Sequence, residues 1–301
     1  GLAVGASLLA TGSTGGSAGT VCTRRRSYAA GPTASVSCAN SCNSTSRKVT
    51  TGMAQNGIST AVDLTGQVAI VTGGARGIGQ ATALALAREG ADIVVGDMLD
   101  TDETVKKVEA LGRRAAGLRT DVTSTADNAA LVAAAVDGFG RLDVLVTCAG
   151  VYGEGALEVD ADEFDRVYAI NAKGTYLSVQ AAWPALEDGG GKVVCVGSIA
   201  GKVGGVLAGP QYAASKGAVH AMVRWFAKYG ASRGVLVNGI APGAVATEMI
   251  KGRGYRESDW PLGRFAEPED MAEAVVYLAG QGSNFLTGKV LSVDGGLLLQ
   301  D

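Results

Sequence analysis

Short apolar runs rich in β-branched residues alternate with alanine-rich stretches through most of this 301-residue chain, and this pattern restricts the fold more than any other feature. The runs are continuous rather than interrupted at every second residue by polar ones, which is typical of strands buried on both faces of a parallel sheet. We expect strands over Gln67–Thr72, Asp92–Gly96, Leu142–Thr147, Lys192–Gly197, Val235–Ile240 and Lys289–Val293.

The segments between these runs have the composition of helices. Repeated strand-helix units with right-handed crossovers build one doubly wound parallel sheet with helices on both faces. No linker interrupts the pattern, so residues 62–301 are expected to form a single α/β domain whose ligand lies beyond the carboxyl ends of the strands. The expected helices are Gly77–Glu89, Thr125–Phe139, Asp162–Leu186, Tyr212–Tyr229 and Glu269–Ala279.

Residues 1–61 have a different composition. They consist mainly of Gly, Ser, Thr and Ala, and they carry five basic residues and no Asp or Glu. Such a segment cannot bury enough apolar surface to fold, so we expect a disordered N-terminal extension. Its Ser-rich, Arg-bearing character resembles an organelle transit peptide, although it lacks an amphipathic helix. We favour Met53, which precedes the folded pattern, as the natural start.

Charge and cysteine content argue against several classes of function. The net charge is −3 without a basic stripe, which argues against nucleic-acid binding. No run of about 20 apolar residues is present, so no membrane span is expected. The five cysteines form no CxxC pair and the chain has one histidine, so no metal site is expected. A large chain with few cysteines in its folded part is typical of the reducing cytoplasm.

A glycine-rich turn follows the first expected strand. It reads Thr-Gly-Gly-Ala-Arg-Gly-Ile-Gly over residues 72–79 and leads directly into a helix. Gly73, Gly77 and Gly79 let the backbone turn tightly and approach a pyrophosphate, while the helix N-terminus presents free N–H groups. Asp97 stands at the end of the second strand, eighteen residues after Gly79. This context predicts a dinucleotide site rather than an ordinary tight turn.

Asp97 also bears on which nicotinamide cofactor binds. A carboxylate there accepts hydrogen bonds from a ribose hydroxyl and repels a 2′-phosphate, which favours NAD over NADP. Arg76 has the opposite effect, because a guanidinium pairs with a phosphate. We give more weight to Asp97, since an uncompensated anion facing a phosphate is the larger penalty. Asp121 and Val122, which precede the helix expected at 125–139, are placed to meet the adenine; the other interpretation is that Asp121 caps this helix, and the two roles are compatible.

Further motifs follow the glycine-rich turn in order: Cys148-Ala149-Gly150, Asn171, Ser198, the segment from Tyr212 to Lys216, and Pro242-Gly243. In this combination the chain resembles the short-chain dehydrogenase/reductase family over roughly residues 64–296. The resemblance implies a single-domain Rossmann-fold, NAD(P)-dependent oxidoreductase that forms a homotetramer or homodimer. It also implies a catalytic tetrad of Asn171, Ser198, Tyr212 and Lys216. The further cofactor contacts implied are Ile78, Met98, Cys148, Ala149, Gly150, Tyr212, Lys216, Pro242, Gly243, Val245 and Thr247.

The chain departs from the family pattern at two points. Thr147 and Cys148 stand where the family usually has two asparagines, which should weaken the bonding that holds the central sheet and the cofactor loop. Ser198 lies fourteen residues before Tyr212, where thirteen is common. The extra residue in the loop 201–211 should reshape the substrate pocket and leave Ser198 in place at its strand end.

Tyr212 and Lys216 are four residues apart on a helix, so their side chains share one face. A lysine ammonium about 4 Å from a phenol lowers the phenol's pKa by roughly three units at an effective dielectric constant of about 20. We therefore expect Tyr212 to act as general acid/base and Ser198 to hydrogen-bond the substrate oxygen. Asn171 is expected to kink its long helix locally and to hold a water leading from Lys216 to solvent.

The polar, glycine-broken segment 247–261 is expected to form a mobile lid. Because only 5% of the residues are aromatic, nothing indicates a pocket for a flat aromatic or steroid substrate. Candidates for the substrate wall are Met249, Ile250, Tyr255 and Trp260. Three cations of the lid either are solvated or attract an acidic substrate: Lys251, Arg253 and Arg256.

The leading hypothesis is a cytoplasmic, NAD-preferring dehydrogenase that interconverts a secondary alcohol and a ketone. The first alternative is an NADPH-dependent 3-oxoacyl-thioester (acyl-carrier-protein) reductase, which Arg76 supports and Asp97 opposes. The second is a redox sensor that binds the dinucleotide without turnover and has no need of the complete tetrad. His220 and the C-terminal run Leu297–Leu299 are expected to pack within the subunit or at a subunit contact.

Overall fold

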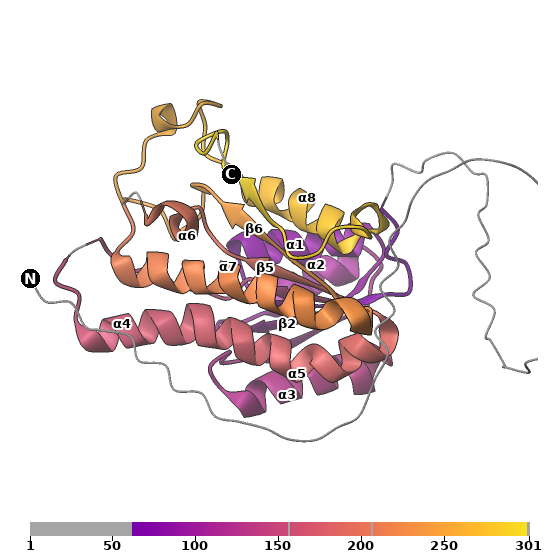
Figure 1. The fold of residues 1–301 in the computed structure, drawn as a ribbon. Coiled ribbons are helices and arrows are strands. Elements are labelled where there is room, and N and C mark those ends of the chain that lie inside the picture. The colour runs from indigo at the N-terminus through magenta and orange to yellow at the C-terminus, as the bar shows by residue number, and fades with distance from the viewer. Residues whose placement is uncertain (1–61, 156, 206, 300–301) are drawn as a thin grey trace, which may run out of the picture. The chain divides into compact units, whose positions relative to one another are not determined.

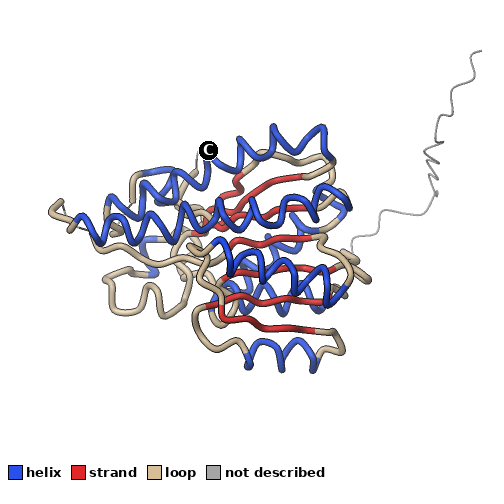
Figure 2. The backbone as a smooth tube through the Cα atoms, turned by 90° about the horizontal axis from the view of Figure 1, so that it is seen from below, coloured by secondary structure: helices blue, strands red, loops and turns tan. Residues whose placement is uncertain are grey.

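The apolar runs form the strands of one parallel sheet (Figure 2). The structure is a computed structural model that describes residues 62–155, 157–205 and 207–299, so the predicted N-terminal extension lies outside the described residues. Seven strands are ordered β3-β2-β1-β4-β5-β6-β7, and every neighbouring pair is parallel. They are β1 (Val68–Thr72), β2 (Asp92–Asp97), β3 (Ala115–Arg119), β4 (Val144–Thr147), β5 (Lys192–Val196), β6 (Leu236–Pro242) and β7 (Val290–Val293).

Helices cover both faces of the sheet (Figure 1). One face packs against α1 (Gly77–Arg88), α2 (Asp102–Ala110) and α8 (Pro268–Ala279). The other packs against α3 (Thr125–Phe139), α5 (Gly174–Gly189) and α7 (Pro210–Gly230). The remaining elements are α4 (Ala161–Tyr168), the π-helical turn η1 (Ala169–Lys173), α6 (Ala200–Val203) and the 3₁₀ turns η2 (Ala231–Arg233), η3 (Glu257–Asp259) and η4 (Gln281–Ser283).

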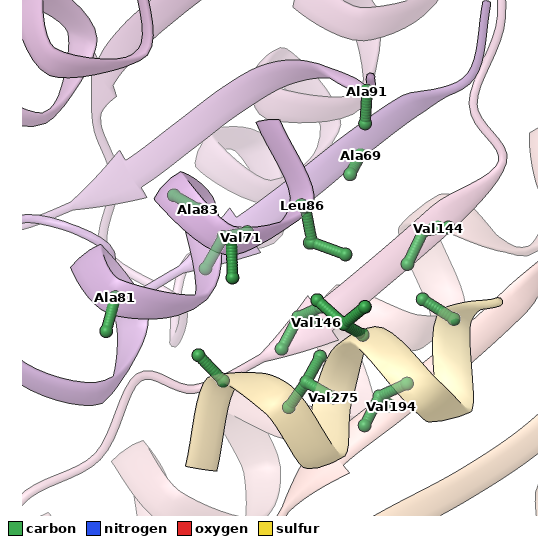
Figure 3. Close-up of a cluster of buried hydrophobic side chains, with 14 of the residues drawn as sticks. Ala69, Val71, Ala81, Ala83, Leu86, Ala91, Val144, Val146, Val194 and Val275 are labelled. Carbon is green, nitrogen blue, oxygen red and sulfur yellow. The ribbon is translucent and has the colours of Figure 1, made fainter. Parts of the chain in front are cut away.

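Small side chains let α1 lie close to the strands. Ala83 and Leu86 of α1 are fully buried against strand residues such as Val71 and Val146. Figure 3 shows these side chains between α1 and the sheet, with Val275 of α8 beside them. Burying a Val or Leu side chain stabilises a fold by about 1.5–3 kcal/mol. This apolar layer therefore keeps the start of α1 in a fixed position over the end of β1.

The six predicted strands are confirmed, and the structure adds elements that the apolar runs do not reveal. β3 has the sequence AAGLR, lies at the sheet edge and is partly exposed, so it contains no continuous apolar run. α2 is short and polar and buries two residues, Thr104 and Val108. The helix expected over 162–186 is divided into α4, η1 and α5, and the irregular turn surrounds Asn171, where we predicted a kink.

The chain direction places the ligand crevice at the centre of the sheet. From β1 the chain adds β2 and β3 on one side, and then crosses to add β4 to β7 on the other. The strand order reverses between β1 and β4, which are neighbours in the sheet. In doubly wound sheets the loops on the two sides of such a point run in opposite directions, which leaves a crevice outside the carboxyl ends of the strands. Here the crevice lies between the loops that follow β1 and β4.

Candidate active site

One large cavity, of about 1480 Å³, opens at the carboxyl ends of the strands. It is bordered by the glycine-rich turn, by residues at the ends of β2, β5 and β6, and by lid residues from 247 onward. Every residue predicted to contact the cofactor borders this cavity, and so do Ser198, Tyr212 and Lys216. Asn171 is the exception among the predicted site residues, because its side chain is fully buried behind the cavity wall.

The glycine-rich turn has no room for a side chain at Gly73 or Gly79. Gly73 has a φ of +68°, and a Cβ on it would lie 2.6 Å from Ala149 Cα. A Cβ on Gly79 would lie 2.0 Å from the carbonyl oxygen of Gly73. Among the described residues, no side chain caps the start of α1 and no acidic residue lies in its first turn. The free N–H groups and the helix dipole therefore fit the pyrophosphate of a dinucleotide.

Asp97 ends β2 beside this turn. Its Oδ2 accepts a hydrogen bond from the Ala75 N–H at 3.0 Å, and its Oδ1 accepts one from the Leu99 N–H at 2.9 Å. These bonds fix the carboxylate at the cavity wall, and each oxygen keeps a further acceptor site for a ribose hydroxyl. Arg76 borders the same cavity with an exposed side chain. The two groups that bear on NAD or NADP preference therefore border one cavity.

Asp121 does not cap α3. The N-cap is Ser124, whose Oγ accepts a hydrogen bond from the Asp127 N–H at 3.2 Å. Asp121 instead accepts hydrogen bonds at its Oδ1 from the N–H and the hydroxyl of Thr123, at 2.9 and 2.7 Å. The capping alternative is therefore wrong, because Asp121 closes the turn that follows β3. In that turn it borders the cavity next to Val122.

Ser198, Tyr212 and Lys216 are held by the end of β5 and by α7. Ser198 follows β5, and its Oγ accepts a hydrogen bond from the Ala200 N–H at 3.1 Å. Tyr212 and Lys216 share one face of α7, with the lysine Nζ 5.8 Å from the centre of the phenol ring. The same Nζ donates to the carbonyl of Val196 at 2.9 Å. This bond ties α7 to the end of β5 and keeps the three side chains together.

Burial dominates the pKa values of this group. It raises the pKa of Tyr212 to about 12, an effect that a hydrogen bond with Ser198 partly offsets. It lowers the pKa of Lys216 to about 8. We expected Lys216 and the positive charge of an oxidised nicotinamide ring together to bring the phenol's pKa toward neutrality; in the protein alone, the cost of burying a phenolate dominates. Tyr212 is therefore protonated at neutral pH, as a general acid must be.

Asn171 holds the loop that follows β4. Its Oδ1 accepts a hydrogen bond from the Val151 N–H at 2.8 Å, and its Nδ2 donates to the Val151 carbonyl at 2.9 Å and to Ser215 Oγ at 3.0 Å. A Cβ on Gly150 would lie 3.2 Å from Asn171 Oδ1 and 3.4 Å from Lys216 Nζ. The two side chains therefore flank Gly150, and the water expected between Lys216 and solvent stays a prediction.

Thr72 links β1 to the end of β4, next to Thr147 and Cys148. Its Oγ1 accepts hydrogen bonds from the N–H groups of Cys148 and Ala149, at 3.2 and 3.3 Å. Burial raises the pKa of the Cys148 thiol to about 12, so the thiol is neutral in the cavity wall. The cofactor loop is thus anchored by its backbone rather than by its own side chains.

Aromatic rings gather along one wall of the cavity. The rings of Tyr152 and Tyr212 lie 5.3 Å apart, and the Tyr152 hydroxyl is 3.1 Å from that of Tyr255. Trp260 follows at 6.0 Å from the Tyr255 ring, and Phe265 at 5.5 Å from Trp260. Five of the aromatic residues of the chain (8 Tyr, 5 Phe and 3 Trp) therefore border this one cavity.

The low total content of aromatic residues did not reveal this cluster, because composition does not show where rings gather, and the absence of a flat aromatic or steroid substrate stays a prediction. Met249, Ile250, Tyr255 and Trp260 border the cavity, as expected for the substrate wall. Tyr152 and Phe265 were not predicted. The signal that could have found Tyr152 is its position two residues after Gly150, at the carboxyl end of a strand, where ligands bind in such sheets.

His220 lies directly behind Ser198. It is 3% exposed, and its Nε2 accepts a long hydrogen bond, of 3.5 Å, from the Ser198 N–H. A Cβ on Gly197 would lie 2.4 Å from the same Nε2, so the ring packs against that backbone. Burial, followed by nearby cations, lowers the pKa of His220 to about 4. His220 is therefore a neutral side chain packed within the subunit.

The described residues offer neither a metal site nor a membrane-spanning helix. No group of three or more His, Cys, Asp and Glu side chains in this part of the chain is arranged to bind a metal ion. No helix formed by these residues combines the length and the apolar character that crossing a membrane requires.

Comparison with known proteins places this geometry in a family. The sequence model described as Enoyl-(Acyl carrier protein) reductase matches residues 73–298. The 3-oxoacyl-(acyl-carrier-protein) reductase FabG of Thermotoga maritima is 36% identical over 245 residues, which cover 78% of this chain and 99% of that protein. The 2-dehydro-3-deoxy-D-gluconate 5-dehydrogenase of Dickeya dadantii is 36% identical over 246 residues, covering 78% of this chain and 97% of that protein.

A solved structure agrees with the sequence relatives. Carveol dehydrogenase from Mycobacterium avium, in complex with NAD, superimposes with a TM-score of 0.76 at 28% identity, over 79% of this chain and 100% of that one. Residues 73–298, which the family model matches, contain β2 to β7 and all the residues that border the cavity. Together with this geometry, these likenesses show that the chain belongs to the short-chain dehydrogenase/reductase family of oxidoreductases.

Proposed function

We propose that the protein is an NAD-preferring dehydrogenase that interconverts a secondary alcohol and a ketone. The catalytic residues are Ser198, Tyr212 and Lys216, with Asn171 as a positioning residue. One observation carries the proposal: the two hydroxyls and the ammonium border the same cavity as the glycine-rich turn and Asp97. Relatives that are named as dehydrogenases of hydroxyl-bearing compounds support it.

The protein's own residues supply position and a proton. When bound, the nicotinamide cofactor accepts or donates the hydride. Ser198 donates a hydrogen bond to the substrate oxygen, and Tyr212 gives its proton to that oxygen as negative charge develops during reduction. In the oxidative direction Tyr212 releases its proton to solvent and, as the phenolate, accepts the proton of the substrate hydroxyl; an ammonium at Lys216, whose Nζ lies 5.8 Å from the ring centre, favours that charged form. Asn171 keeps Gly150 and Val151 in place beside Lys216.

Cofactor preference is the first property to measure. NADH and NADPH oxidation should be compared at equal concentrations against a panel of diketones, acetoacetyl thioesters, keto-steroids and keto-sugars. We expect NADH to be used at least about tenfold faster, because two facing anions cost several kcal/mol. Asp97→Ala should lower the ratio of the NADH rate to the NADPH rate. Asp100→Ala, which removes a carboxylate nearby in sequence, should leave this ratio unchanged. Faster use of NADPH by the wild-type protein would contradict the NAD preference.

An NADPH-dependent 3-oxoacyl-thioester reductase is the second candidate function. Arg76 favours it, because its exposed guanidinium borders the cavity where a 2′-phosphate would be bound. The likeness to the FabG reductase of Thermotoga maritima favours it as well. In the rate comparison, NADPH consumption on acetoacetyl thioester would select this candidate. A sensor without turnover is less well supported, because it needs neither Ser198 nor Tyr212 in the cavity.

We further propose that the protein forms a homodimer or homotetramer through α5 and α7. Trp225 of α7 is 59% exposed and its ring stacks on that of Tyr229 at 5.3 Å. Tyr176 of α5 adds a third exposed ring, 6.1 Å from Phe226. Neighbouring exposed aromatic rings are typical of a protein interface. Sedimentation should show an oligomer that Trp225→Glu dissociates, and a monomeric wild-type protein would exclude the proposal.

A further inference from the structure

Arg253 differs from the other two lid cations in where its side chain lies. Lys251 pairs with Glu248 at 3.3 Å and Arg256 with Asp259 at 3.0 Å, and each of these cations is 75% exposed. Arg253 is 30% exposed, and its guanidinium carbon lies 4.3 Å from the centre of the Tyr152 ring. It is therefore the lid cation that faces an aromatic wall of the cavity rather than solvent.

The guanidinium of Arg253 and the phenol ring of Tyr212 both lie against the ring of Tyr152. Tyr152 lies 5.3 Å from the Tyr212 ring and carries Arg253 on its face. These two distances place the guanidinium carbon no farther than about 9.6 Å from the centre of the Tyr212 ring. Both groups border the same cavity, so one small molecule can contact Tyr212 with its oxygen and Arg253 with its other end.

Arg253 is held in place by a backbone bond and is paired with an exchangeable carboxylate. Its Nε donates to the Met249 carbonyl at 2.7 Å, which orients the guanidinium. Its ion-pair partner is Glu154, whose side chain is 77% exposed. An ion pair with so exposed a partner is worth about 0–1 kcal/mol. A ligand carboxylate inside the cavity makes a stronger, bidentate pair, because it is shielded from water by the aromatic rings.

We propose that Arg253 is the substrate-recognition residue and that the substrate is a hydroxy or oxo acid with an apolar, ring-containing body. The inference rests on the proposed dehydrogenase function and names its substrate class. In the absence of substrate the Glu154 carboxylate forms an ion pair with the Arg253 guanidinium, and the carboxylate of the substrate displaces it. The aromatic wall from Tyr152 to Tyr255 packs against the apolar part of the molecule.

The test compares an acid with its neutral ester. The probes are 4-oxocyclohexanecarboxylate and its methyl ester, reduced by the full-length protein with NADH and with NADPH. We expect kcat/KM of the wild-type protein to be about 10- to 100-fold higher for the acid than for the ester. This is the effect expected from hydrogen bonds to a charged group. Arg253→Met should remove this preference mainly through KM and leave the ester rate unchanged. Arg256→Met, the matched lid arginine, should change neither rate.

Glu154→Gln should act in the opposite direction. Removing the competing carboxylate is expected to raise kcat/KM for the acid several-fold, with no change for the ester. If Arg253→Met lowers the acid and the ester rates equally, Arg253 only fastens the lid and the proposal is wrong. If the wild-type protein reduces both probes equally well, the proposed function stands and the inferred substrate class is wrong.

If neither probe is reduced, that result counts against the proposed function. A binding measurement then tests the inference about Arg253 separately. Calorimetric titration of the oxo acid into the protein with NAD⁺ forms a complex that cannot react, because both components are oxidised. Saturable binding that Arg253→Met weakens by about 10-fold or more supports recognition of the carboxylate by Arg253. Absence of binding, or equal binding by the variant, overturns it.

Discussion

Replacing Tyr212 with Phe is expected to lower kcat by about 100- to 10,000-fold, the range contributed by a positioned general acid or base. The substitution removes the phenolic proton and keeps the ring. The packing of that ring against Tyr152, at 5.3 Å, should therefore persist. Because Tyr212 is 8% exposed, solvent cannot easily replace the missing proton donor. Steady-state rates in the reductive direction measure the loss.

The control is Tyr229→Phe, which makes the same chemical change near the other end of α7. Tyr229 is 40% exposed and does not border the cavity, so its loss should leave kcat unchanged. The Kd for NADH should stay at the wild-type value in Tyr229→Phe and rise by no more than about tenfold in Tyr212→Phe, which removes one predicted hydroxyl contact and leaves the glycine-rich turn untouched. Full activity of Tyr212→Phe would show that another group supplies the proton.

The sheet could be predicted from sequence because buried parallel strands leave a strong signal. Runs such as residues 193–196 are apolar at every position, and the structure buries all of them. β3 leaves no such signal, since an edge strand is covered less completely and can carry exposed residues such as Arg119. An edge strand is therefore missed when, like β3, it lacks an apolar run, whereas β7 at the other edge keeps such a run and was predicted.

The polar part of the site could also be predicted, because its residues follow strands whose carboxyl ends meet at one edge. Gly73 and Asp97 come together for this reason. The substrate side could not, since Tyr152 and Arg253 are about a hundred residues apart in sequence and meet only when the lid packs against the loop after β4. The pKa of Tyr212 was missed for a similar reason, because helical spacing to Lys216 does not reveal how deeply the phenol is buried.

The second large effect concerns His220, whose titration should make the fold sensitive to acid. In the unfolded chain a histidine binds its proton near pH 6.5, whereas burial delays protonation in the folded protein to about pH 4. Between these values the unfolded state binds more protons, so stability is complete above pH 6.5 and falls as the pH decreases. The shift corresponds to a loss of up to about 3 kcal/mol from this one side chain.

His220→Gln tests the prediction, because glutamine does not titrate and can still accept the hydrogen bond from the Ser198 N–H. The free energy of unfolding should be measured for both proteins from pH 7.5 to pH 4.5 at one fixed protein concentration. Carboxylates titrate alike in both proteins, so their contribution cancels in the difference. The variant should lose less stability than the wild-type protein as the pH falls, by up to about 3 kcal/mol.

His220→Leu separates the charge from the hydrogen bond. Leucine also does not titrate, so this variant should show the same reduced acid sensitivity as His220→Gln. It leaves the Ser198 N–H without its acceptor, which should cost about 1–3 kcal/mol at every pH. If the free energy of unfolding depends on pH in both variants as it does in the wild-type protein, His220 takes up its proton as readily in the folded protein as in the unfolded chain. The backbone at Gly197 and Ser198 would then move enough to hydrate the ring.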